Sequence, residues 1–330
     1  MPATTRVAVL DDYQRRASGY ADWARLGPDV EVVFFHEPIP PADLEAELAR
    51  FDVLVLMRER TAFRRPVLER LPRLRLLITT GTRNASVDDD YLREAGVVYC
   101  GTGRSDNGPT PGVPSTAEVA WALILATCKR VVAEDRAIRG GRWQLDLPVN
   151  LSGATLGLAG LGHLGSAMIG PARAFGMHTI AWSENLSDER ATSLGARRVS
   201  KAELLAGSDV LSIHLVLSDR TRGLFQAADL AQMKPTAVLI NTSRGPIVDE
   251  QALIAALRSN TIAAAGLDVY ETEPLPAGHP LTTLDNVVLL PHLGYVSEAG
   301  FRQMYGQVVE DIVAFLAGSP IRTISPPAPV

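Results

Sequence analysis

The stretch TLGLAGLGHLGSAM, residues 155–168, joins an apolar strand pattern to three spaced glycines. The glycines have the spacing G-x-G-x-x-G, directly after a predicted strand and at the start of a predicted helix. Glycine there allows a tight turn, a close approach of a pyrophosphate to the backbone, and close packing of the helix on the sheet. The dinucleotide site predicted from this stretch consists of Gly160, Gly162, His163, Leu164 and Gly165.

Strand and helix patterns alternate on both sides of this stretch. Such alternation is typical of parallel sheets with helices on both faces. A glycine turn without a ligand is the alternative for residues 155–168, and the strands around it favour the nucleotide site. The predicted fold class is α/β, with two doubly wound, Rossmann-like parallel sheets. The predicted strands span residues 6–10, 30–35, 52–57, 74–79, 155–160, 178–182, 209–215, 237–242, 263–269 and 286–291.

Local signals divide the chain further. Residues 101–118 are dense in Gly and Pro, which predicts a crossing between two domains. Ser115, followed three residues later by Glu118, predicts a capping box at the start of the next helix. An amphipathic helix over 298–318 is expected to pack on the first domain. Pro171 predicts a kink or an early end of the helix after the glycines, because proline removes a backbone hydrogen bond.

Composition excludes several function classes. The 32 basic and 37 acidic residues give a net charge of −5, which disfavours nucleic acid and anionic membrane as partners. The apolar run 119–128 is shorter than the roughly 20 residues needed to span a bilayer. Cys100 and Cys128 form no metal-binding pattern, so no metal is expected. With no signal-peptide pattern at residues 1–13, we expect a cytoplasmic location.

Charged side chains follow three later predicted strands. Arg244 comes just after one, Asp268 and Glu273 after the next, and His292 after the last. In an open parallel sheet, ligands bind outside the carboxyl ends of the strands, so these residues should gather there. Arginine can bind a carboxylate and polarise the neighbouring carbonyl, while histidine supplies a proton near neutral pH. A carboxylate such as Glu273 would orient the ring and favour its charged form.

Each of these residues also has a structural alternative. Taken singly, an arginine after a strand is usually a surface charge, loop acids are usually solvated, and a lone histidine is more often structural. Their joint placement after successive strands favours a catalytic set of Arg244, Glu273 and His292.

The cofactor preference rests on the end of the strand 178–182. Ser183 and Glu184 lie where an acid usually holds the ribose hydroxyls of NAD. Glu184 would repel a 2′-phosphate, and no arginine stands beside it, so NAD is favoured. NADP is not excluded, because Glu184 is equally well explained as a solvated loop acid.

Five segments together carry a family resemblance: TLGLAGLGHLG, SIHLVLSDRTRGL, LINTSRGPIVDE, AGLDVYETEPLP and LLPHLGYVS. In this order and spacing the chain resembles the D-isomer-specific 2-hydroxyacid dehydrogenases. The resemblance implies hydride transfer between NAD(H) and a D-2-hydroxy acid or its 2-oxo acid. It implies that Asp268 contacts the nicotinamide carboxamide, and that His214 and Thr242 line the cofactor site.

The resemblance also implies a domain organisation. The substrate domain is expected to comprise residues 1–110 plus 299–330, and the NAD(P)-binding Rossmann domain residues 111–298, with a cleft between the domains. A homodimer built largely through the cofactor domains is implied as well.

Substrate contacts are expected from two loops of the first domain. In similar enzymes the loop corresponding to 79–88 offers backbone amides to the substrate carboxylate. Three arginines near these loops favour a substrate with a second anionic group, phosphoglycerate-like or hydroxypyruvate-like. The alternative is that two of them pair with Glu59 or other surface acids. The expected contacts are Arg58, Arg60, Gly81, Thr82 and Arg83.

Two rival functions stay open. One is an NADP-dependent glyoxylate or hydroxypyruvate reductase. The other is a non-catalytic, cofactor-gated dimeric protein of the corepressor type, which some relatives of this fold resemble. The complete set of Arg244, Glu273 and His292 favours an enzyme, because a scaffold would not need it.

Overall fold

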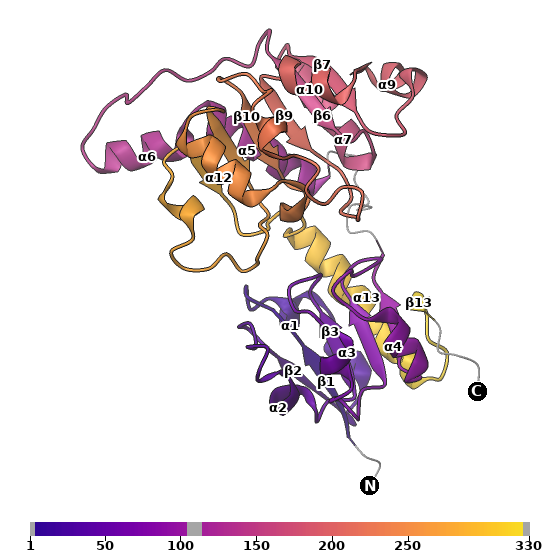
Figure 1. Cartoon of the computed structure of the whole chain (residues 1–330). Coiled ribbons are helices and arrows are strands. Elements are labelled where there is room, and N and C mark those ends of the chain that lie inside the picture. Colours follow the sequence, from indigo (N-terminus) through magenta and orange to yellow (C-terminus); the bar gives the residue numbers. More distant parts are fainter. Residues whose placement is uncertain (1–3, 104–113, 326–330) are drawn as a thin grey trace. The chain divides into compact units, whose positions relative to one another are not determined.

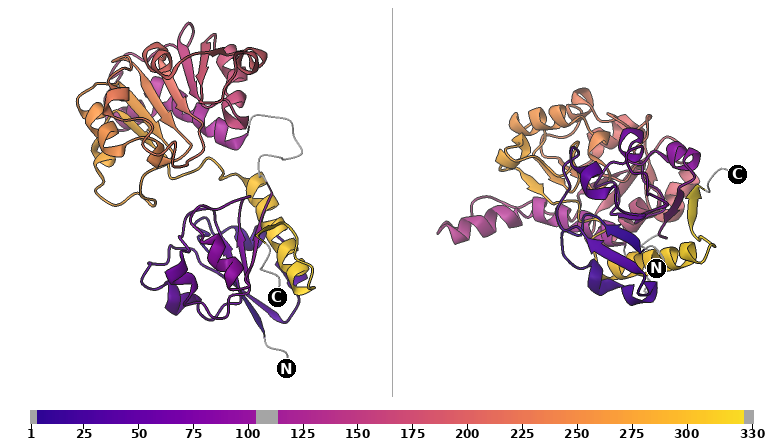
Figure 2. Two further views of the ribbon diagram at one scale, coloured as in Figure 1. Left: turned by 45° about the vertical axis from the view of Figure 1, so that its right-hand side comes forward. Right: turned by 90° about the horizontal axis from the view of Figure 1, so that it is seen from below.

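The computed structural model describes residues 4–103 and 114–325, which form two compact units. The first unit lies within Met1–Pro111 and Ser297–Val330, and the second within Gly112–Val296. Figure 1 shows the elements of each unit, and Figure 2 gives two further views. Much of the Gly- and Pro-rich crossing predicted over 101–118 lies outside the described residues.

The first unit contains a six-stranded sheet in the order β13-β5-β4-β3-β1-β2. The strands β1 to β5 are parallel, and β13 pairs antiparallel with β5. The order 2-1-3-4-5 is that of a doubly wound α/β sheet. The elements are β1 (Thr5–Val9), α1 (Ala17–Tyr20), η1 (Trp23–Leu26), β2 (Val30–Phe34), α2 (Leu44–Leu48), β3 (Val53–Leu56), α3 (Arg65–Leu68), β4 (Leu76–Thr79), α4 (Asp89–Glu94), β5 (Val98–Gly101), α13 (Glu298–Leu316) and β13 (Thr323–Ser325).

Helices cover both faces of this sheet. Leucines of α2, α3 and α4 join one apolar cluster with residues from β3, β4 and β5. On the other face α13 packs beside α1 and η1. Phe301 of α13 meets Tyr20 edge-on with ring centroids 6.2 Å apart, and Tyr305 lies 6.3 Å from Trp23. The helix predicted over 298–318 is therefore confirmed, together with its packing on the first unit.

The second unit contains a seven-stranded parallel sheet in the order β12-β11-β10-β9-β6-β7-β8. Counted from β6, this is the Rossmann order 3-2-1-4-5-6 with a seventh strand added. The elements are α5 (Ser115–Cys128), α6 (Val131–Arg139), β6 (Thr155–Ala159), α7 (His163–Ala167), α8 (Ile169–Ala174), β7 (His178–Trp182), α9 (Asp188–Leu194), β8 (Arg197–Arg198), α10 (Lys201–Gly207), β9 (Val210–Ile213), α11 (Ala227–Leu230), β10 (Val238–Asn241), η2 (Gly245–Ile247), α12 (Glu250–Arg258), β11 (Ala264–Leu267), η3 (Pro280–Thr283) and β12 (Val287–Leu289).

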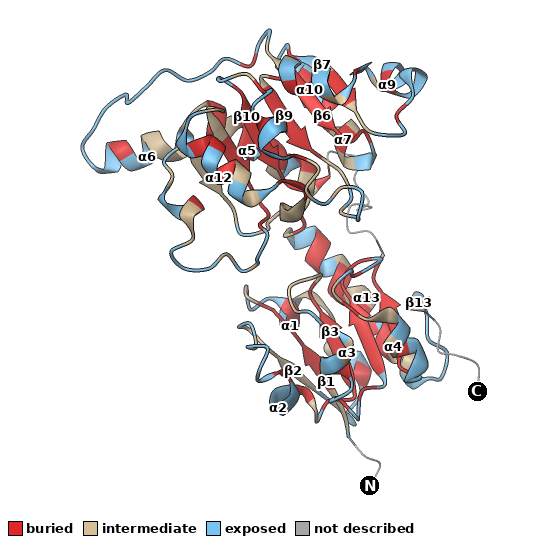
Figure 3. Cartoon of the chain, in the orientation of Figure 1, coloured by how far each residue is buried: buried red, intermediate tan, exposed pale blue. Residues whose placement is uncertain are grey.

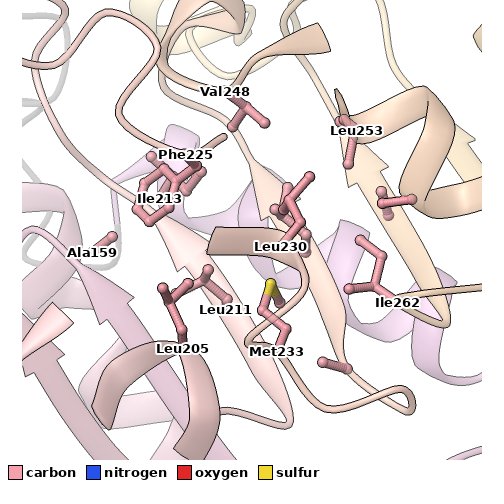
Figure 4. Packing of buried hydrophobic residues seen from close by; sticks show 14 of the residues in the cluster. Ala159, Leu205, Leu211, Ile213, Phe225, Leu230, Met233, Val248, Leu253 and Ile262 are labelled. Atoms are coloured by element: carbon pink, nitrogen blue, oxygen red, sulfur yellow. The ribbon is translucent and has the colours of Figure 1, made fainter. Parts of the chain in front are cut away.

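Alternate strand residues of the second unit enter two separate cores. Leu211 and Ile213 of β9 pack under α10, α11 and α12, where Phe225 and Leu230 complete the cluster (Figure 4). Val210 points to the opposite face, which α5, α7, α8 and α9 cover. Figure 3 shows the strands buried between these helix layers. This confirms the predicted α/β fold class with two parallel sheets, and all ten predicted strands are present.

The helix after the glycines is interrupted, as Pro171 predicts. It divides into α7 and α8 at Met168, whose amide donates to the Gly165 carbonyl three residues earlier, one residue closer than in an α-helix. Pro171 has no amide hydrogen, so the Ala167 carbonyl lacks the usual donor four residues ahead. The irregular ladder around 167–172 is thus confirmed.

The predicted capping box at Ser115 is wrong. The helix α5 begins at Ser115 itself, Pro114 is its N-cap, and no side chain caps the first turn. The Pro114 carbonyl instead accepts from the amides of Ala117 and Glu118. The start of the helix lies one residue earlier than the Ser-x-x-Glu pattern suggests, because proline with its fixed φ fits a helix start well.

None of the helices within residues 4–103 and 114–325 combines the length and the apolar character needed to cross a membrane.

A buried acid ties the last strand to the first unit. Arg322 precedes β13 and donates through Nε to Asp311 Oδ1 at 2.9 Å, and through Nη2 to the Gln307 carbonyl at 2.9 Å. Asp311 is fully buried on α13. Burial raises the pKa of Asp311 from 3.8 to about 7, although the nearby Arg322 opposes this change.

We therefore expect Asp311 to make stability depend on pH. Because its pKa is higher in the folded state, its contribution is complete below about pH 4 and is lost as the pH rises through about 7. Relative to Asp311→Asn, the free energy of unfolding of the wild type should fall over this range in urea titrations. Glu298→Gln, which changes an exposed acid of α13 that pairs with Arg302 instead of Arg322, is the control. If the free energies of unfolding of wild type and Asp311→Asn depend on pH in the same way, the raised pKa of Asp311 is contradicted.

Candidate active site

Three loops of the second unit meet at one edge of its sheet. The strands β10 and β11 pair in parallel from Val238↔Ala264 to Asn241↔Leu267, and β11 pairs with β12 up to Leu267↔Leu289. Since parallel strands end on the same side, the segments after β10, β11 and β12 emerge together. These segments carry Arg244, Glu273 and His292.

His292 and Glu273 form a direct pair. His292 Nδ1 and Glu273 Oε2 are 2.5 Å apart, and the side chains are 18% and 27% exposed. An ionised carboxylate only accepts hydrogen bonds, so Nδ1 carries the proton and Nε2 is left for exchange with a substrate. The other carboxylate oxygen, Oε1, accepts from the Tyr270 amide at 3.0 Å. Both oxygens of Glu273 are therefore fixed.

Asp268 shapes the turn that carries His292. It is fully buried, and its two oxygens accept from the amides of Leu293 at 2.6 Å and Gly294 at 2.8 Å. Burial raises the pKa of Asp268, while these hydrogen bonds and the nearby His292 act in the opposite direction. His292 has a φ of 56°, in the left-handed region that non-glycine residues rarely adopt. The Asp268 bonds hold this strained turn in place. The predicted contact with a carboxamide stays a prediction.

Arg244 follows β10 in a turn braced by Asn241. The Asn241 side chain accepts from the Ser243 amide and donates to the Arg244 carbonyl, both at 3.0 Å. Arg244 is half-buried, and its Nη1 donates to the Ser243 carbonyl at 2.7 Å. A Cβ on Gly245 would come within 2.0 Å of the Tyr270 carbonyl carbon. Glycine thus lets the Arg244 turn lie directly against the loop that carries Glu273.

The glycine turn lies between β6, β7 and β9. The Gly160 amide donates to Trp182 at 2.8 Å, and a Cβ on this residue would lie 2.6 Å from the His214 carbonyl oxygen. A Cβ on Gly165 would lie 2.1 Å from the Gly160 carbonyl oxygen, so only glycine lets α7 come this close. A Cβ on Gly162 would meet nothing within 4 Å. The backbone at Gly162 is therefore open to a ligand, as a pyrophosphate site requires.

The intervening residues of the turn border this opening. His163 is exposed at the start of α7, and Leu164 is half-buried. The Ser166 hydroxyl donates to the His163 carbonyl at 3.0 Å. This bond fixes the first turn of α7 while leaving the imidazole ring on the surface.

His214 directly follows β9, and Thr242 directly follows β10. His214 Nε2 lies 2.9 Å from Ser212 Oγ, and burial lowers the pKa of His214 to about 4, so the ring is neutral at pH 7. Thr242 Oγ1 is buried and has no hydrogen-bond partner within the described ranges. A buried hydroxyl without a partner is unfavourable unless a ligand or water completes it. Together with the open backbone at Gly162, Thr242 fits a bound dinucleotide.

Ser183 and Glu184 follow β7, beside the glycine turn. The Ser183 carbonyl accepts from the Leu186 amide at 3.1 Å, which closes a tight turn. Glu184 is exposed. The turn places an acid at the end of the second Rossmann strand, where a ribose is usually bound.

The remaining predicted residues belong to the first unit. Arg58 follows β3 with a φ of 53°, and its amide donates to Thr80 Oγ1 at 3.0 Å. A Cβ on Gly81 would lie 2.7 Å from Arg58 Nη1, so the guanidinium packs over the Gly81 backbone. Thr82 and Arg83 are exposed. Arg58 is thus brought to the Gly81 loop.

Arg60 points elsewhere in the same unit. Its Nη1 donates to the Asp11 carbonyl at 2.6 Å, and its guanidinium carbon lies 4.4 Å from the centre of the Tyr13 ring. The position of Arg60 is therefore explained by its contacts with Asp11 and Tyr13.

Sequence reasoning missed several residues that brace the site. Asn241 had a usable signal, because asparagine often closes a turn through its own side chain. Tyr270 acts through its backbone amide, and Tyr295 meets His292 edge-on with ring centroids 5.3 Å apart. Neither residue has a local sequence signal. No cluster of His, Cys, Asp and Glu suited to a metal ion occurs within the part of the chain that the structure describes.

Comparison with known proteins places these features in a family. Residues 121–294 match the model described as D-isomer specific 2-hydroxyacid dehydrogenase, NAD binding domain. A glyoxylate reductase of Aeropyrum pernix is 39% identical over 302 residues, covering 88% of this chain and 87% of the relative. A hydroxypyruvate reductase of Blautia hydrogenotrophica is 30% identical over 329 residues, covering 97% and 99%. The structure of phosphoglycerate oxidoreductase from Vibrio cholerae O395 matches with a TM-score of 0.88 at 34% identity, covering 96% of this chain and 100% of that one.

The open backbone at Gly162 leads to a prediction about cofactor binding. Gly162→Ala should fold with unchanged stability, because its Cβ meets no atom, yet fill space meant for the pyrophosphate. We expect the NADH dissociation constant, measured by fluorescence titration, to rise at least about tenfold, or about 1.4 kcal/mol.

Two further glycines serve as comparisons. Gly165→Ala should instead lower the free energy of unfolding, by about 1–3 kcal/mol, because α7 must move away from Gly160. Gly170→Ala, on the exposed side of α8, should change neither property. Unaltered NADH affinity in Gly162→Ala would place the dinucleotide elsewhere.

Proposed function

Because this chain belongs to the D-isomer-specific 2-hydroxyacid dehydrogenases, a family of NAD-linked oxidoreductases, we propose that it reduces short 2-oxo acids of the hydroxypyruvate type to D-2-hydroxy acids. The observation that carries this proposal is the pairing of His292 with Glu273 at 2.5 Å. The loop that carries Glu273 lies directly against the Arg244 turn, because Gly245 has no side chain to separate them. Relatives named glyoxylate and hydroxypyruvate reductase support the substrate class.

The proposed roles follow from the chemistry of each side chain. Bound NADH supplies the hydride that reaches the carbonyl carbon. Arg244 binds the substrate carboxylate and polarises the adjacent carbonyl. His292 donates the Nε2 proton to the carbonyl oxygen, which completes the hydroxyl group. Glu273 keeps the ring oriented through Nδ1 and stabilises the charged imidazolium before the proton is transferred.

The two units have different proposed tasks. The second unit binds the cofactor at Gly160, Gly162 and Gly165, and its exposed Glu184 disfavours the 2′-phosphate of NADP. The first unit supplies the substrate loops, with the Gly81 backbone as a carboxylate site. Within that unit we assign substrate contact to Arg58 and a packing role to Arg60.

A second candidate substrate class follows from the Gly81 loop. Arg58 packs on Gly81, and Arg83 is exposed two residues later. Two guanidinium groups around one loop favour a second anionic group on the substrate, such as the phosphate of phosphohydroxypyruvate.

A substrate panel tests the proposal. Oxidation of NADH or NADPH is followed by absorbance with hydroxypyruvate, glyoxylate, phosphohydroxypyruvate and longer 2-oxo acids. The proposal expects the highest kcat/KM for hydroxypyruvate with NADH, and a higher value for phosphohydroxypyruvate would select the second candidate. Tight NADH binding without turnover of any 2-oxo acid would refute both and favour a corepressor-type binding protein.

Substitutions of His292 and Arg244 should change different kinetic constants. His292→Ala should lower kcat by at least about 100-fold with little change in NADH affinity, since general acid catalysis typically contributes 100- to 10,000-fold. Arg244→Ala should lower kcat and also raise KM for the 2-oxo acid, because it removes a substrate contact. Steady-state kinetics and NADH titration measure these effects. Wild-type activity in either variant would mean that the wrong residue is assigned.

Glu273 should affect the pH profile. Reduction needs the protonated His292 ring, so activity falls as the pH rises. Glu273→Gln removes the negative charge that favours the imidazolium, and we expect the fall in kcat/KM to move to lower pH. Glu271→Gln, on the exposed side of the same loop, is the control. An unchanged profile in Glu273→Gln would argue against the pairing as a catalytic device.

We also propose that the protein forms a homodimer through an arm of the second unit, defined as residues 131–149. The helix α6 and the segment after it project from the body of the unit (Figures 1 and 2). Exposed apolar patches of this kind mark interaction sites. The large apolar side chains exposed on the arm are Val131, Ile138, Trp143, Leu145, Leu147 and Val149.

Substitutions in the arm test this proposal. Trp143 and Leu147 are 71% and 89% exposed, so replacing both by Ser should leave the unit folded. We expect the dimer dissociation constant to rise at least about 100-fold, since one interface hot spot contributes about 2 kcal/mol or more. Sedimentation equilibrium measures it, with Val216→Ser, equally exposed but outside the arm, as the control. A monomeric wild type, or an unaffected variant, would contradict the proposed interface.

A further inference from the structure

A second imidazole–carboxylate pair lies in the loop that carries Glu273. His279 Nε2 and Glu250 Oε1 are 3.1 Å apart, and the side chains are only 14% and 16% exposed. His279 Nδ1 accepts from the Leu281 amide at 3.4 Å, so Nε2 carries the proton and donates to Glu250. The proposed chemistry uses neither residue.

Glu250 holds the loop at two points. Its second oxygen, Oε2, accepts from the Glu271 amide at 3.1 Å. Glu250 lies in the first turn of α12, which is packed in the core of the second unit. It therefore fixes the loop two residues before Glu273 and, through His279, six residues after it.

The loop needs such anchors. Residues 271–279 form no helix or strand and are mostly exposed, with Leu275 as an apolar contact to the core. Segments with few buried contacts open readily unless other bonds hold them. A hydrogen bond of 2.5 Å between Glu273 and His292 tolerates little displacement of its carboxylate.

We propose that Glu250 and His279 are positioning residues that keep Glu273 in contact with His292. This inference rests on the proposed function. The other charged groups beside the two pairs are Asp268, near His292, and Arg222, whose Nη1 lies 3.8 Å from Glu271. Neither is bonded to Glu250 or His279 in the described residues.

Kinetics of matched variants form the first arm of the test. His279→Ala should lower kcat for 2-oxo acid reduction by about tenfold or more, because misplacing a catalytic group by 1 Å costs up to about 100-fold. NADH affinity should stay unchanged, and the pH profile should move in the direction expected for Glu273→Gln. His279→Gln, whose amide nitrogen replaces Nε2 as the donor to Glu250, should restore most of the activity.

The matched control is Asn286→Ala. It removes two side-chain hydrogen bonds of 3.1 Å, to Leu257 and Ala263, at the opposite end of the same strands. Its thermal stability should fall as in His279→Ala, without the change in pH profile. In the Glu273→Gln background, His279→Ala should have no further effect on that profile, because both changes act on one contact.

The second arm needs no turnover. The Nδ1 proton of His292, held in a short bond to Glu273, should give a far-downfield proton NMR signal, assigned by its loss in Glu273→Gln and His292→Gln. The signal should persist in His279→Gln and Asn286→Ala, and weaken or move upfield in His279→Ala. An unchanged signal in His279→Ala overturns the positioning role even if the enzyme is active. If the wild type is inactive on every 2-oxo acid, the proposed function is overturned. The NMR result still decides whether Glu250 and His279 keep Glu273 in contact with His292.

Discussion

The parallel pairing of β10, β11 and β12 brings the three segments that follow them to a single edge of one sheet. Arg244, Glu273 and His292 are far apart in the chain, and this pairing removes most of that distance. The Arg244 turn then lies directly against the Glu273 loop, because Gly245 has no side chain to separate the turn from Tyr270. The proposed chemistry thus depends on a backbone arrangement that the buried cores on both faces stabilise.

The turn at His292 stores strain that its neighbours offset. A left-handed φ on a non-glycine residue costs about 1–3 kcal/mol and persists only where the surroundings determine it. Here Asp268 accepts hydrogen bonds from the amides of the two residues after His292. Glu273 binds the imidazole ring, and Tyr295 packs against the ring. The local cost in stability is accompanied by a fixed direction of the imidazole ring, which the proposed proton donor requires.

Two histidines of the second unit show how environment sets a role. His214 is half-buried beside the Ser212 hydroxyl, and desolvation lowers its pKa to about 4, which keeps the ring neutral at pH 7. His292 instead lies against the carboxylate of Glu273, 2.5 Å from its Nδ1. Both residues follow strands of the same sheet, so their partners distinguish the proposed cofactor contact from the proposed acid.

Sequence alone determined the fold class, the glycine turn, the break at Pro171 and the set of residues after successive strands. These features depend on local patterns, in which periodicity, glycine spacing and a missing amide act on neighbouring residues. Only tertiary structure decided that Arg60 stacks on Tyr13, that Asp268 holds the His292 turn, and that Glu250 and His279 clamp the Glu273 loop. Short strands such as β8 also escaped prediction. The contacts of Arg60, Asp268 and Glu250 join residues that are distant in the chain. The partner of each side chain is fixed only when the fold brings the two backbone segments together.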